Sequence, residues 1–330
     1  MKIVLLGSGS FGTSIATVLA RNGHDVVVVT RSQECAISIN ESHKNPFYLT
    51  DWELPTNLRA TTDLSEGVKD AELIIHSIPV QATHHYLTVN KSHFNKHVPF
   101  VSTSKGLHTD TLQMMNEIIA SVLGEDQLSA FFSGPSFAKE LMAAMPTAVV
   151  VASTHSHVAE FVRTAFASPS LRVYVSTDVI GVEVGGALKN VFAIAAGVLE
   201  GMNLGQNTSA ALVTRGCAEM NRLARAMGAH PDTMSGLAGM GDLVLTCMGS
   251  LSRNKSVGLR LGRGETPEQI RATMKEVAEG VATAPAALKL AHRYNIRVPI
   301  VEAVNLLLEG KMTAQETMVH LMSLPTSTEH

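Results

Sequence analysis

The N-terminal stretch "KIVLLGSGSFG" constrains the fold more than any other part of the chain. Its apolar run predicts a buried strand, and Gly7, Gly9 and Gly12 follow that strand in the spacing GxGxxG. A helical pattern comes next, at Thr13–Asn22, and a second apolar run at Val26–Thr30 completes the unit. In this context the first glycine permits a tight turn, the second lets the backbone approach a pyrophosphate, and the third lets helix and strand pack closely.

A dinucleotide on this loop would place its pyrophosphate at the start of the helix, near the amides of Ser10 and Phe11. The end of the second strand usually carries an acidic residue that binds the ribose 2′-hydroxyl of NAD. Here the sequence has Thr30 and Arg31 instead. An arginine suits the 2′-phosphate of NADPH, so we expect NADPH or NADH with a preference for NADPH. The alternative is that Arg31 is an ordinary solvated residue at a helix start.

The rest of the first half alternates strand-like and helix-like segments, including an amphipathic stretch at Thr111–Leu123. This alternation predicts an α/β fold with a mostly parallel, doubly wound, Rossmann-like sheet. Several of the apolar runs are nearly continuous, which is typical of strands covered on both faces. The predicted strands are Lys2–Leu6, Val26–Thr30, Leu73–Ser77, Phe100–Ser104, Ala130–Phe132, Ala148–Ala152 and Leu171–Val175.

From Gly181 onward helical patterns dominate. We therefore expect a Rossmann-like cofactor domain over residues 1–180, followed by an all-α substrate domain over residues 181–330. The stretch "ETPEQI" predicts a helix start, with Thr266 as cap and Gln269 completing a capping box. The predicted helices are Val182–Leu199, Ser209–Met227, Pro267–Ala278, Ala284–Tyr294, Ile300–Leu308 and a last short helix.

Composition excludes several classes of protein. The 330 residues are 45% hydrophobic and 17% charged, which is enough to form two domains that each have a hydrophobic core. A net charge of −3 provides no basic field for nucleic acid, and three scattered cysteines argue against a disulfide framework or a cysteine-rich metal site. We find neither a signal peptide nor a run of about 18 apolar residues. We expect a cytoplasmic protein without nucleic-acid partners, stable membrane insertion or a metal.

Chemically active residues follow several predicted strands of the first half. "VPFVSTSKGL" ends in Lys105, which would meet the cofactor or an anionic substrate unless it is a surface lysine. "FFSGPSFAKEL" carries Gly134 and Ser136 at the turn into a helix, where Ser136 would cap the helix while the helix start faces a ligand. A purely structural turn explains this stretch nearly as well. In "HSIP", His76 is expected to pack or hydrogen-bond locally.

The second half contains a candidate phosphate site. "LAGMGDLVLTC" places Asp242 in a glycine-flanked turn between apolar segments, and "GSLSRN" follows with Ser252, Arg253 and Asn254. An arginine fork beside hydroxyl and amide donors suits a phosphate monoester. The alternative is a solvated turn before a helix.

Lys189 is the only charged residue between Val184 and Leu199, within an otherwise apolar predicted helix. It shares a helix face with Gly185 and Gly186, and these glycines are understandable if another backbone or a ligand approaches closely. A lysine in this position could exchange a proton at a carbonyl oxygen. The alternatives are that it pairs with a buried carboxylate such as Glu183, or extends to the surface.

Together these motifs resemble the bacterial NAD(P)-dependent glycerol-3-phosphate dehydrogenases along essentially the whole chain. The matching stretches are "GSGSFGTSIA", "STSKGL", "SGPSFAKE", "GVEVGGALKNVFAIAAG", "GQNTSAALVTRG", "LAGMGDLVLTC" and "SRN". The resemblance implies reversible reduction of dihydroxyacetone phosphate to sn-glycerol 3-phosphate, the precursor of membrane phospholipids. It also implies a Rossmann-like domain, an all-helical C-terminal domain and a homodimer.

The resemblance further implies roles for individual residues. Lys189 matches the proton donor and acceptor, and Arg253 matches a position that serves both ligands. The segment "GETPEQIRATMKEVAEG" is less typical of the family, which bears on Val277 and Glu279. Cofactor roles fall on Gly7, Gly9, Ser10, Phe11, Gly12, Arg31, Lys105, Ala138, Arg253, Val277 and Glu279. Substrate roles fall on Lys105, Gly134, Ser136, Lys189, Asp242, Ser252, Arg253 and Asn254.

Two other interpretations compete with this one. A β-hydroxyacid dehydrogenase also combines a Rossmann domain with a helical domain and a catalytic lysine. Those enzymes typically place an asparagine one helical turn from the lysine and bind a carboxylate, whereas Asn190 here is adjacent to Lys189. A nicotinamide-responsive binding protein could keep the fold without turnover, but the presence of Lys189, Asp242 and Arg253 argues against it.

Overall fold

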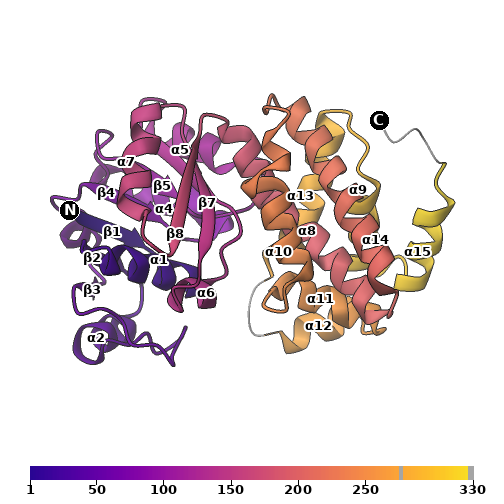
Figure 1. Ribbon diagram of the computed structural model, residues 1–330, viewed down its shortest axis with the longest axis horizontal. Coiled ribbons are helices and arrows are strands. Elements are labelled where there is room, and N and C mark those ends of the chain that lie inside the picture. Colours follow the sequence, from indigo (N-terminus) through magenta and orange to yellow (C-terminus); the bar gives the residue numbers. More distant parts are fainter. Residues whose placement is uncertain (275–277, 326–330) are drawn as a thin grey trace. The chain divides into compact units, whose positions relative to one another are not determined.

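The computed structural model describes residues 1–274 and 278–325. The chain divides into two compact units, one formed by residues 1–105 and 113–183 and the other by residues 106–112 and the chain from 184 onward. The division thus falls between Glu183 and Val184, and the sequence analysis placed a boundary near residue 180. The first unit contains a β-sheet, and the second is built from helices (Figure 1).

The sheet of the first unit has the strand order β3-β2-β1-β4-β5-β6-β7-β8. Strand β7 runs antiparallel to β6, and the other neighbouring pairs are parallel. The predicted mostly parallel, doubly wound sheet is therefore confirmed. The strands are β1 (Lys2–Leu6), β2 (Asp25–Val29), β3 (Leu58–Thr61), β4 (Leu73–His76), β5 (Phe100–Ser102), β6 (Ser129–Ser133), β7 (Thr147–Ala152) and β8 (Leu171–Ser176).

The sequence analysis missed strand β3. Its four residues read LRAT, and only Leu58 and Ala60 are buried, so no continuous apolar run marks it. It is an edge strand, in which Arg59 points outward and pairs with Asp25 of the neighbouring strand. A short, half-exposed edge strand has too few apolar residues to be distinguished from a loop.

Helices cover both faces of the sheet (Figure 1). Helix α1 packs beside α6 and α7, whereas α4 and α5 pack against each other. The chain reverses its winding direction between β1 and β4, which are neighbours in the sheet, and ligands of such sheets bind at this point. The helices are α1 (Ser10–Arg21), α2 (Gln33–Ser42), α3 (Leu64–Val68), α4 (Val80–Asn90), α5 (Met115–Leu123), α6 (Ala138–Met142) and α7 (Ser156–Phe166), with a 3₁₀ turn at Lys91–His93.

The second unit begins within the long helix α8, which starts at Val179 in the first unit. The predicted cap of α12 is confirmed, because Thr266 and Gln269 form a capping box and Pro267 opens the helix. That helix ends at Thr273 rather than Ala278. The helices are α8 (Val179–Gly201), α9 (Gly205–Ala226), α10 (Asp242–Met248), α11 (Arg253–Gly262), α12 (Pro267–Thr273), α13 (Glu279–Arg293), α14 (Pro299–Leu308) and α15 (Ala314–Ser323), with a 3₁₀ turn at Thr233–Ser235.

Helix α8 is the core of the second unit, and glycines bring α11 into backbone contact with it. A Cβ atom on Gly197 would lie 2.0 Å from the carbonyl oxygen of Lys255. A Cβ atom on Gly258 would lie 1.8 Å from the carbonyl oxygen of Ile194. Since real Cβ atoms do not approach this closely, only glycine permits this helix crossing.

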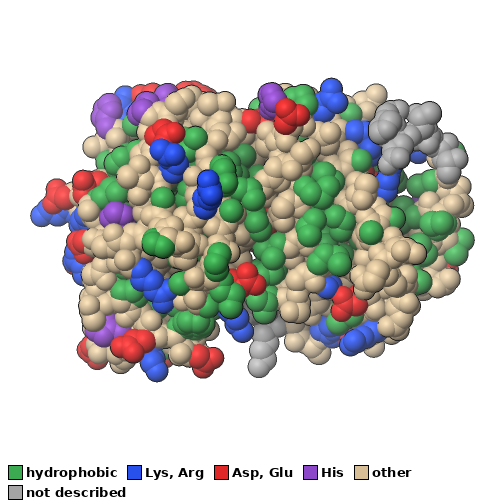
Figure 2. Space-filling model, viewed as in Figure 1, with side chains coloured by type: hydrophobic (Ala, Val, Ile, Leu, Met, Phe, Trp, Pro, Cys, Tyr) green, Lys and Arg blue, Asp and Glu red, His purple; other side chains and the backbone are tan. Residues whose placement is uncertain are grey.

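Among the described residues, α8 is long and apolar enough to cross a membrane by length and composition. The expectation that the chain holds no such segment is therefore wrong by this criterion. However, 78% of its apolar window is buried inside the protein, so α8 has the features of a core helix. On the face shown in Figure 2, cationic and anionic side chains are interspersed, which agrees with the small net charge.

Candidate cofactor and substrate sites

The glycine loop after β1 has the geometry that a dinucleotide requires. Gly7 has a φ of +106°, and a Cβ atom there would lie 2.8 Å from the carbonyl oxygen of Ser77. A Cβ atom on Gly12 would lie 2.2 Å from the carbonyl oxygen of Gly7, so α1 packs directly on the turn. A Cβ atom on Gly9 would meet no atom of the described residues within 4 Å, apart from its own chain neighbours and the adjoining backbone. Gly9 therefore borders open space that a side chain would otherwise occupy, and the loop fits a pyrophosphate.

The N-terminus of α1 suits an anion. The helix begins at Ser10, followed by Phe11, and its N-cap residue Gly9 provides no side-chain hydrogen bond. By contrast, the N-terminus of α2 is capped by the side chain of Ser32. The first amides of α1 therefore lack an internal side-chain cap, and helix N-termini of this kind bind phosphate groups.

The end of β2 carries hydroxyl and guanidinium groups in place of a carboxylate. The Oγ1 atom of Thr30 lies 2.7 Å from the Oγ atom of Ser8, so the two strand ends are joined by hydroxyl groups. Arg31 is exposed and precedes Ser32, the N-cap of α2. Arg31 thus follows the carboxyl end of β2, the strand next to β1 and its glycine loop, and the ribose of a dinucleotide binds at this end of the second strand.

Lys105, Gly134 and Ser136 lie together in the first unit. The carbonyl oxygen of Gly134 accepts a hydrogen bond from Nζ of Lys105 (3.0 Å) and another from Oγ of Ser136 (2.9 Å). The same Nζ atom lies 5.9 Å from the centroid of the Phe11 ring, which links this group to the start of α1. Ser136 does not cap the next helix, because the N-cap of α6 is Phe137 and Ala138 is its first residue. The expectation that Ser136 caps the helix is therefore wrong.

His76 is a structural residue, as predicted. Its ring is fully buried, with Nε2 3.3 Å from Oγ1 of Thr83 and Nδ1 3.2 Å from Oγ of Ser104. Burial lowers the pKa of His76 to about 3. The ring is neutral at physiological pH and serves local hydrogen bonding.

In the second unit, Lys189 pairs with Asp242. Nζ of Lys189 donates a hydrogen bond to Oδ1 of Asp242, and the two side chains are 11% and 0% exposed. The alternative pairing with Glu183 is wrong, because Glu183 accepts a hydrogen bond from the backbone amide of Asn116 instead. The expected close approach to the lysine helix is present: a Cβ atom on Gly185 would lie 2.3 Å from the carbonyl oxygen of Ala238.

Asp242 is the first residue of α10 rather than part of a turn. A π-helical turn, Leu237–Gly241, precedes it, and such turns often occur at functional sites. The sequence analysis missed Thr246, whose Oγ1 donates to the carbonyl oxygen of Asp242 (2.6 Å) and lies 3.4 Å from its Oδ1. Its i+4 spacing on an apolar helix would have been the signal. Burial raises the pKa of the neighbouring Cys247 to about 12, so its thiol stays protonated.

The "SRN" stretch forms the start of α11. Ser252 caps the helix through its Oγ atom, and Arg253 is its exposed first residue. The side chain of Asn254 is directed inward: Nδ2 donates to Oδ1 of Asn190 (2.9 Å), and Oδ1 accepts from the amide of Gly280 (2.9 Å). The alternative of a solvated turn therefore fails for Ser252 and Asn254, which are buried.

The amide of Gly280 belongs to the first turn of α13, which begins at Glu279. Asn254 thus joins the beginning of α11 to the beginning of α13 and, through Asn190, to α8, the helix that carries Lys189. Val277, another predicted cofactor residue, lies outside the described residues. Within the described ranges, no group of three or more His, Cys, Asp or Glu side chains is arranged to hold a metal ion.

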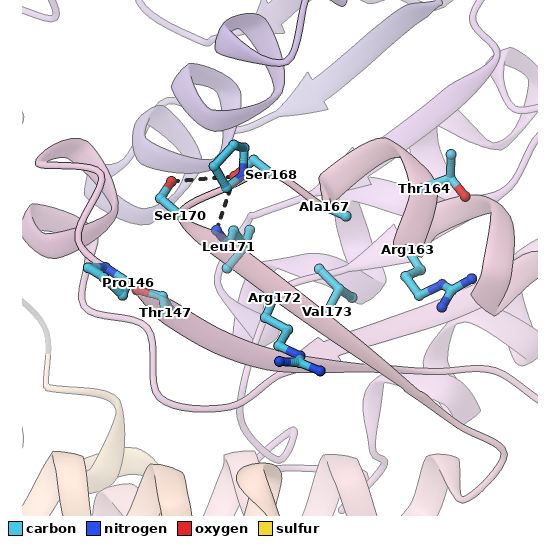
Figure 3. Close-up of a pocket in the computed structure, with 11 residues that line it drawn as sticks. Pro146, Thr147, Arg163, Thr164, Ala167, Ser168, Ser170, Leu171, Arg172 and Val173 are labelled. Carbon is cyan, nitrogen blue, oxygen red and sulfur yellow. Dashed lines mark hydrogen bonds between the residues drawn. The ribbon is translucent and has the colours of Figure 1, made fainter.

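An open pocket of about 690 Å³ lies along β8 and α7 in the first unit (Figure 3). Its two arginines are both engaged within the protein: Arg163 pairs with Glu160, and Arg172 stacks over the ring of Tyr174. None of the predicted site residues lines this pocket. The sequence motifs therefore point to the glycine loop and the Lys189–Asp242 pair rather than to this cavity.

Two family models match the chain. The N-terminal domain of NAD-dependent glycerol-3-phosphate dehydrogenases matches residues 2–159, and the C-terminal domain of the same enzymes matches residues 178–319. The chain belongs to the glycerol-3-phosphate dehydrogenase family. The glycine loop and the Lys189–Asp242 pair lie in the N-terminal and C-terminal matches, respectively.

Relatives at full length support the same assignment. The chain is 46% identical to glycerol-3-phosphate dehydrogenase [NAD(P)+] of Leptospira biflexa, over 98% of both chains. It is 44% identical to the enzyme of the same name from Myxococcus xanthus, over 100% of this chain and 99% of that protein. The crystal structure of glycerol-3-phosphate dehydrogenase from Coxiella burnetii is similar, with a TM-score of 0.92 and 34% identity over 98% and 99% of the two chains.

More distant reductases share the fold alone with this chain. 2-Dehydropantoate 2-reductase from Geobacter metallireducens has a TM-score of 0.63 at 14% identity, over 94% of this chain and all of that one. The predicted family, enzyme class and cofactor class are therefore confirmed. The protein is an NAD(P)-dependent dehydrogenase that interconverts dihydroxyacetone phosphate and sn-glycerol 3-phosphate.

Proposed function

We propose that Lys189 is the proton donor and acceptor of this reaction. Its hydrogen bond to the buried carboxylate of Asp242 is the observation that carries the proposal. Reducing a ketone to an alcohol requires a hydride at carbon and a proton at oxygen, and bound nicotinamide supplies the hydride. The ammonium of Lys189 protonates the ketone oxygen in reduction, and its neutral amine takes the proton back in oxidation.

Asp242 orients Lys189 for this transfer. An ammonium has three N–H donors, and the bond to Asp242 commits one of them. The carboxylate is held in turn by its place at the start of α10 and by the nearby hydroxyl of Thr246. The pair thus fixes the direction of the lysine head group before substrate binds, which reduces the cost of ordering it in the transition state.

The start of α11 is the proposed binding site for the substrate phosphate. The guanidinium of Arg253 provides a planar set of hydrogen-bond donors. The positive end of the helix dipole at the N-terminus of α11 also favours a negatively charged phosphate. Ser252 and Asn254 flank this arginine, and Lys105, Gly134 and Ser136 are the proposed substrate residues of the first unit. Phosphate binding remote from the ketone would orient the reacting carbon.

The proposed cofactor residues are centred on the glycine loop. Gly7, Gly9 and Gly12 shape the loop, while the amides at Ser10 and Phe11 face the pyrophosphate. Exposed Arg31 favours the 2′-phosphate of NADPH, since Thr30 and Arg31 rather than a carboxylate directly follow β2. Lys105, Ala138, Arg253, Val277 and Glu279 complete the proposed set.

We also propose that residues 1–180 form the cofactor-binding domain and residues 181–330 the substrate-binding domain, although each domain contributes some residues to the other ligand, as named above. A cytoplasmic homodimer is the proposed working form, supported by the resemblance of the whole chain to its bacterial relatives. Light scattering coupled to gel filtration would give the mass of the particle. A mass equal to one chain would overturn the dimer.

Lys189→Ala tests the proton-transfer role. Oxidation of NADPH is followed by nicotinamide absorbance with dihydroxyacetone phosphate, for wild type, Lys189→Ala and Lys289→Ala. Lys289 is an exposed lysine of α13, so its variant controls for loss of a positive charge. We expect kcat of Lys189→Ala to fall by about 10²–10⁴-fold, the usual contribution of a general acid, with NADPH affinity unchanged.

Two results would count against this assignment. Full activity of Lys189→Ala would keep the enzyme but remove Lys189 from the chemical step. Loss of NADPH binding in a folded Lys189→Ala variant would also count against it, because Lys189 would then support the cofactor site rather than the proton transfer.

A further inference from the structure

Asn45 is a buried polar residue that the reaction scheme above does not use. It is 0% exposed and lies in the segment that joins α2 to β3. The base of this segment is closed by a hydrogen bond of 2.8 Å from the amide of Leu54 to the carbonyl oxygen of His43. Burying an amide side chain is unfavourable unless its polar atoms are bonded, so its partners indicate its role.

The Asn45 side chain connects this segment to the glycine loop. Nδ2 donates to the carbonyl oxygen of Ser8 (2.9 Å) and to Oγ1 of Thr13 (2.8 Å). Oδ1 accepts from the backbone amides of Phe47 (3.0 Å) and Tyr48 (3.1 Å). Two donors and two acceptor positions are thus all engaged, which is the full capacity of the group.

Both the backbone carbonyl and the side-chain hydroxyl of Ser8 are held by hydrogen bonds. Its carbonyl oxygen also receives a hydrogen bond from Oγ1 of Thr13 (3.2 Å), and its hydroxyl lies 2.7 Å from the hydroxyl of Thr30. Fixing the carbonyl fixes the whole Ser8–Gly9 peptide plane, because the unit is rigid. In a trans peptide the N–H points opposite to the C=O. The amide of Gly9 is therefore directed away from the buried pair Asn45 and Thr13.

We infer that Asn45 is a positioning residue of the dinucleotide site. By holding the carbonyl of Ser8 inward, it aims the amide of Gly9 outward as a donor for the pyrophosphate of the cofactor. The same side chain holds the turn at Phe47 and Tyr48 against the loop, so the α2–β3 segment and the glycine loop are one assembly. This inference rests on the cofactor site assigned under the proposed function.

Asn45→Asp separates this role from simple closure of the turn. Aspartate keeps the shape and can still accept from the amides of Phe47 and Tyr48, but its carboxylate cannot donate to the carbonyl of Ser8. A residue that only closes the turn would tolerate this change, whereas a residue that orients the Ser8–Gly9 peptide would not. Thr13→Val is a milder second variant, since it removes the other hydrogen bond to the same carbonyl.

The measurement is calorimetric titration of each variant with NADPH and with ADP-ribose, which contains the pyrophosphate but no nicotinamide. We expect Asn45→Asp to raise both dissociation constants by a similar factor, roughly tenfold or more, as for loss of an oriented hydrogen bond to a charged group. Thr13→Val should raise both by less. At saturating NADPH, kcat and the KM for dihydroxyacetone phosphate should stay near their wild-type values.

Asn40→Asp is the matched control. Asn40 bridges α2 to the backbone of Ala60 in β3 with two hydrogen bonds of 2.8 Å, and neither bond involves the glycine loop. Its variant should bind both ligands like wild type. Emission of Trp52, the one tryptophan of the chain and part of the same segment, reports whether the segment remains folded.

The outcomes separate this inference from the function on which it rests. Failure of the wild-type protein to bind NADPH or ADP-ribose would overturn the cofactor site itself. Unchanged affinity for both ligands in folded Asn45→Asp would overturn the positioning role and leave the cofactor site intact. Weakened binding of NADPH alone would also overturn it, since the effect would then lie away from the pyrophosphate.

Discussion

Lys189 of α8 and Asp242 of α10 form an ion pair in which the carboxylate is fully buried and the lysine is 11% exposed. Moving two charges out of water is unfavourable, and their attraction offsets that cost only when the geometry is good. Such a pair is a poor way to stabilise a helical unit compared with well-packed apolar side chains. Its presence on the long, apolar and largely buried helix α8 therefore favours a chemical role.

Asp242→Asn should damage both stability and catalysis. The change leaves Lys189 without its charged partner in a mostly buried position, and breaking such a pair costs about 3 kcal/mol of unfolding free energy. We also expect a lower kcat, because the ammonium loses the group that orients it. Urea denaturation and steady-state kinetics would measure the two effects. Wild-type kcat in a folded variant would contradict the orienting role.

Arg31→Gln should change cofactor preference. The exposed guanidinium follows β2 and would bind the 2′-phosphate of NADPH through charge-assisted hydrogen bonds, which contribute about 1.5–3 kcal/mol. We expect a higher KM for NADPH and little change for NADH, in contrast to exposed Arg293→Gln, which should affect neither. An equal rise in KM for NADPH and NADH would show that Arg31 does not distinguish the two cofactors at the ribose 2′-position.

Gly258→Ala should destabilise the second unit strongly. The added methyl group would lie 1.8 Å from the carbonyl oxygen of Ile194, a backbone atom that cannot move independently of α8. Overpacking of this kind typically costs about 1–3 kcal/mol or more, and we expect the upper end here. Ser256→Ala, an exposed change on the same helix, is the control. Equal thermal stability of the two variants would contradict the close helix crossing.

The success of sequence reasoning differed between local and long-range features. The glycine loop could be predicted because a side chain at Gly7 or Gly12 would clash with nearby backbone, and this requirement recurs at a fixed spacing in the sequence. The Rossmann-like sheet followed from apolar runs such as β1, whose residues Ile3–Leu6 are 0% exposed. Edge strand β3 could not be predicted in this way, because half of its residues face solvent.

The hydrogen-bond partners of buried polar residues could not be predicted from the periodicity of apolar residues in the sequence. Lys189 was recognisable as unusual, but its choice of Asp242 over Glu183 depends on a contact between residues 53 positions apart. Likewise, nothing in the sequence around Asn45 indicates that its amide reaches Ser8, 37 residues earlier. Such pairings are set by the packing of whole elements, which local patterns do not encode.

Glu219 should make the stability of the protein depend on pH. Its side chain is 2% exposed, and its carboxyl oxygens accept from the amides of Ile300 (2.9 Å) and Val301 (3.4 Å) at the start of α14. Burial is the largest effect and raises the pKa of Glu219 to about 7. Between the ordinary glutamate pKa of 4.5 and about 7, the folded protein holds this proton while the unfolded chain has released it. The stabilisation is therefore complete below pH 4.5 and is lost as pH rises through about 7.

Glu219→Gln isolates this contribution, because glutamine keeps an acceptor for Ile300 but does not titrate. We expect the unfolding free energy of the variant, relative to wild type, to rise by about 2 kcal/mol between pH 5 and pH 8. Urea denaturation at several pH values in that window would measure the difference, since other carboxylates contribute equally to both proteins. A constant difference between the two proteins across the window would mean that the folded protein does not raise the pKa of Glu219.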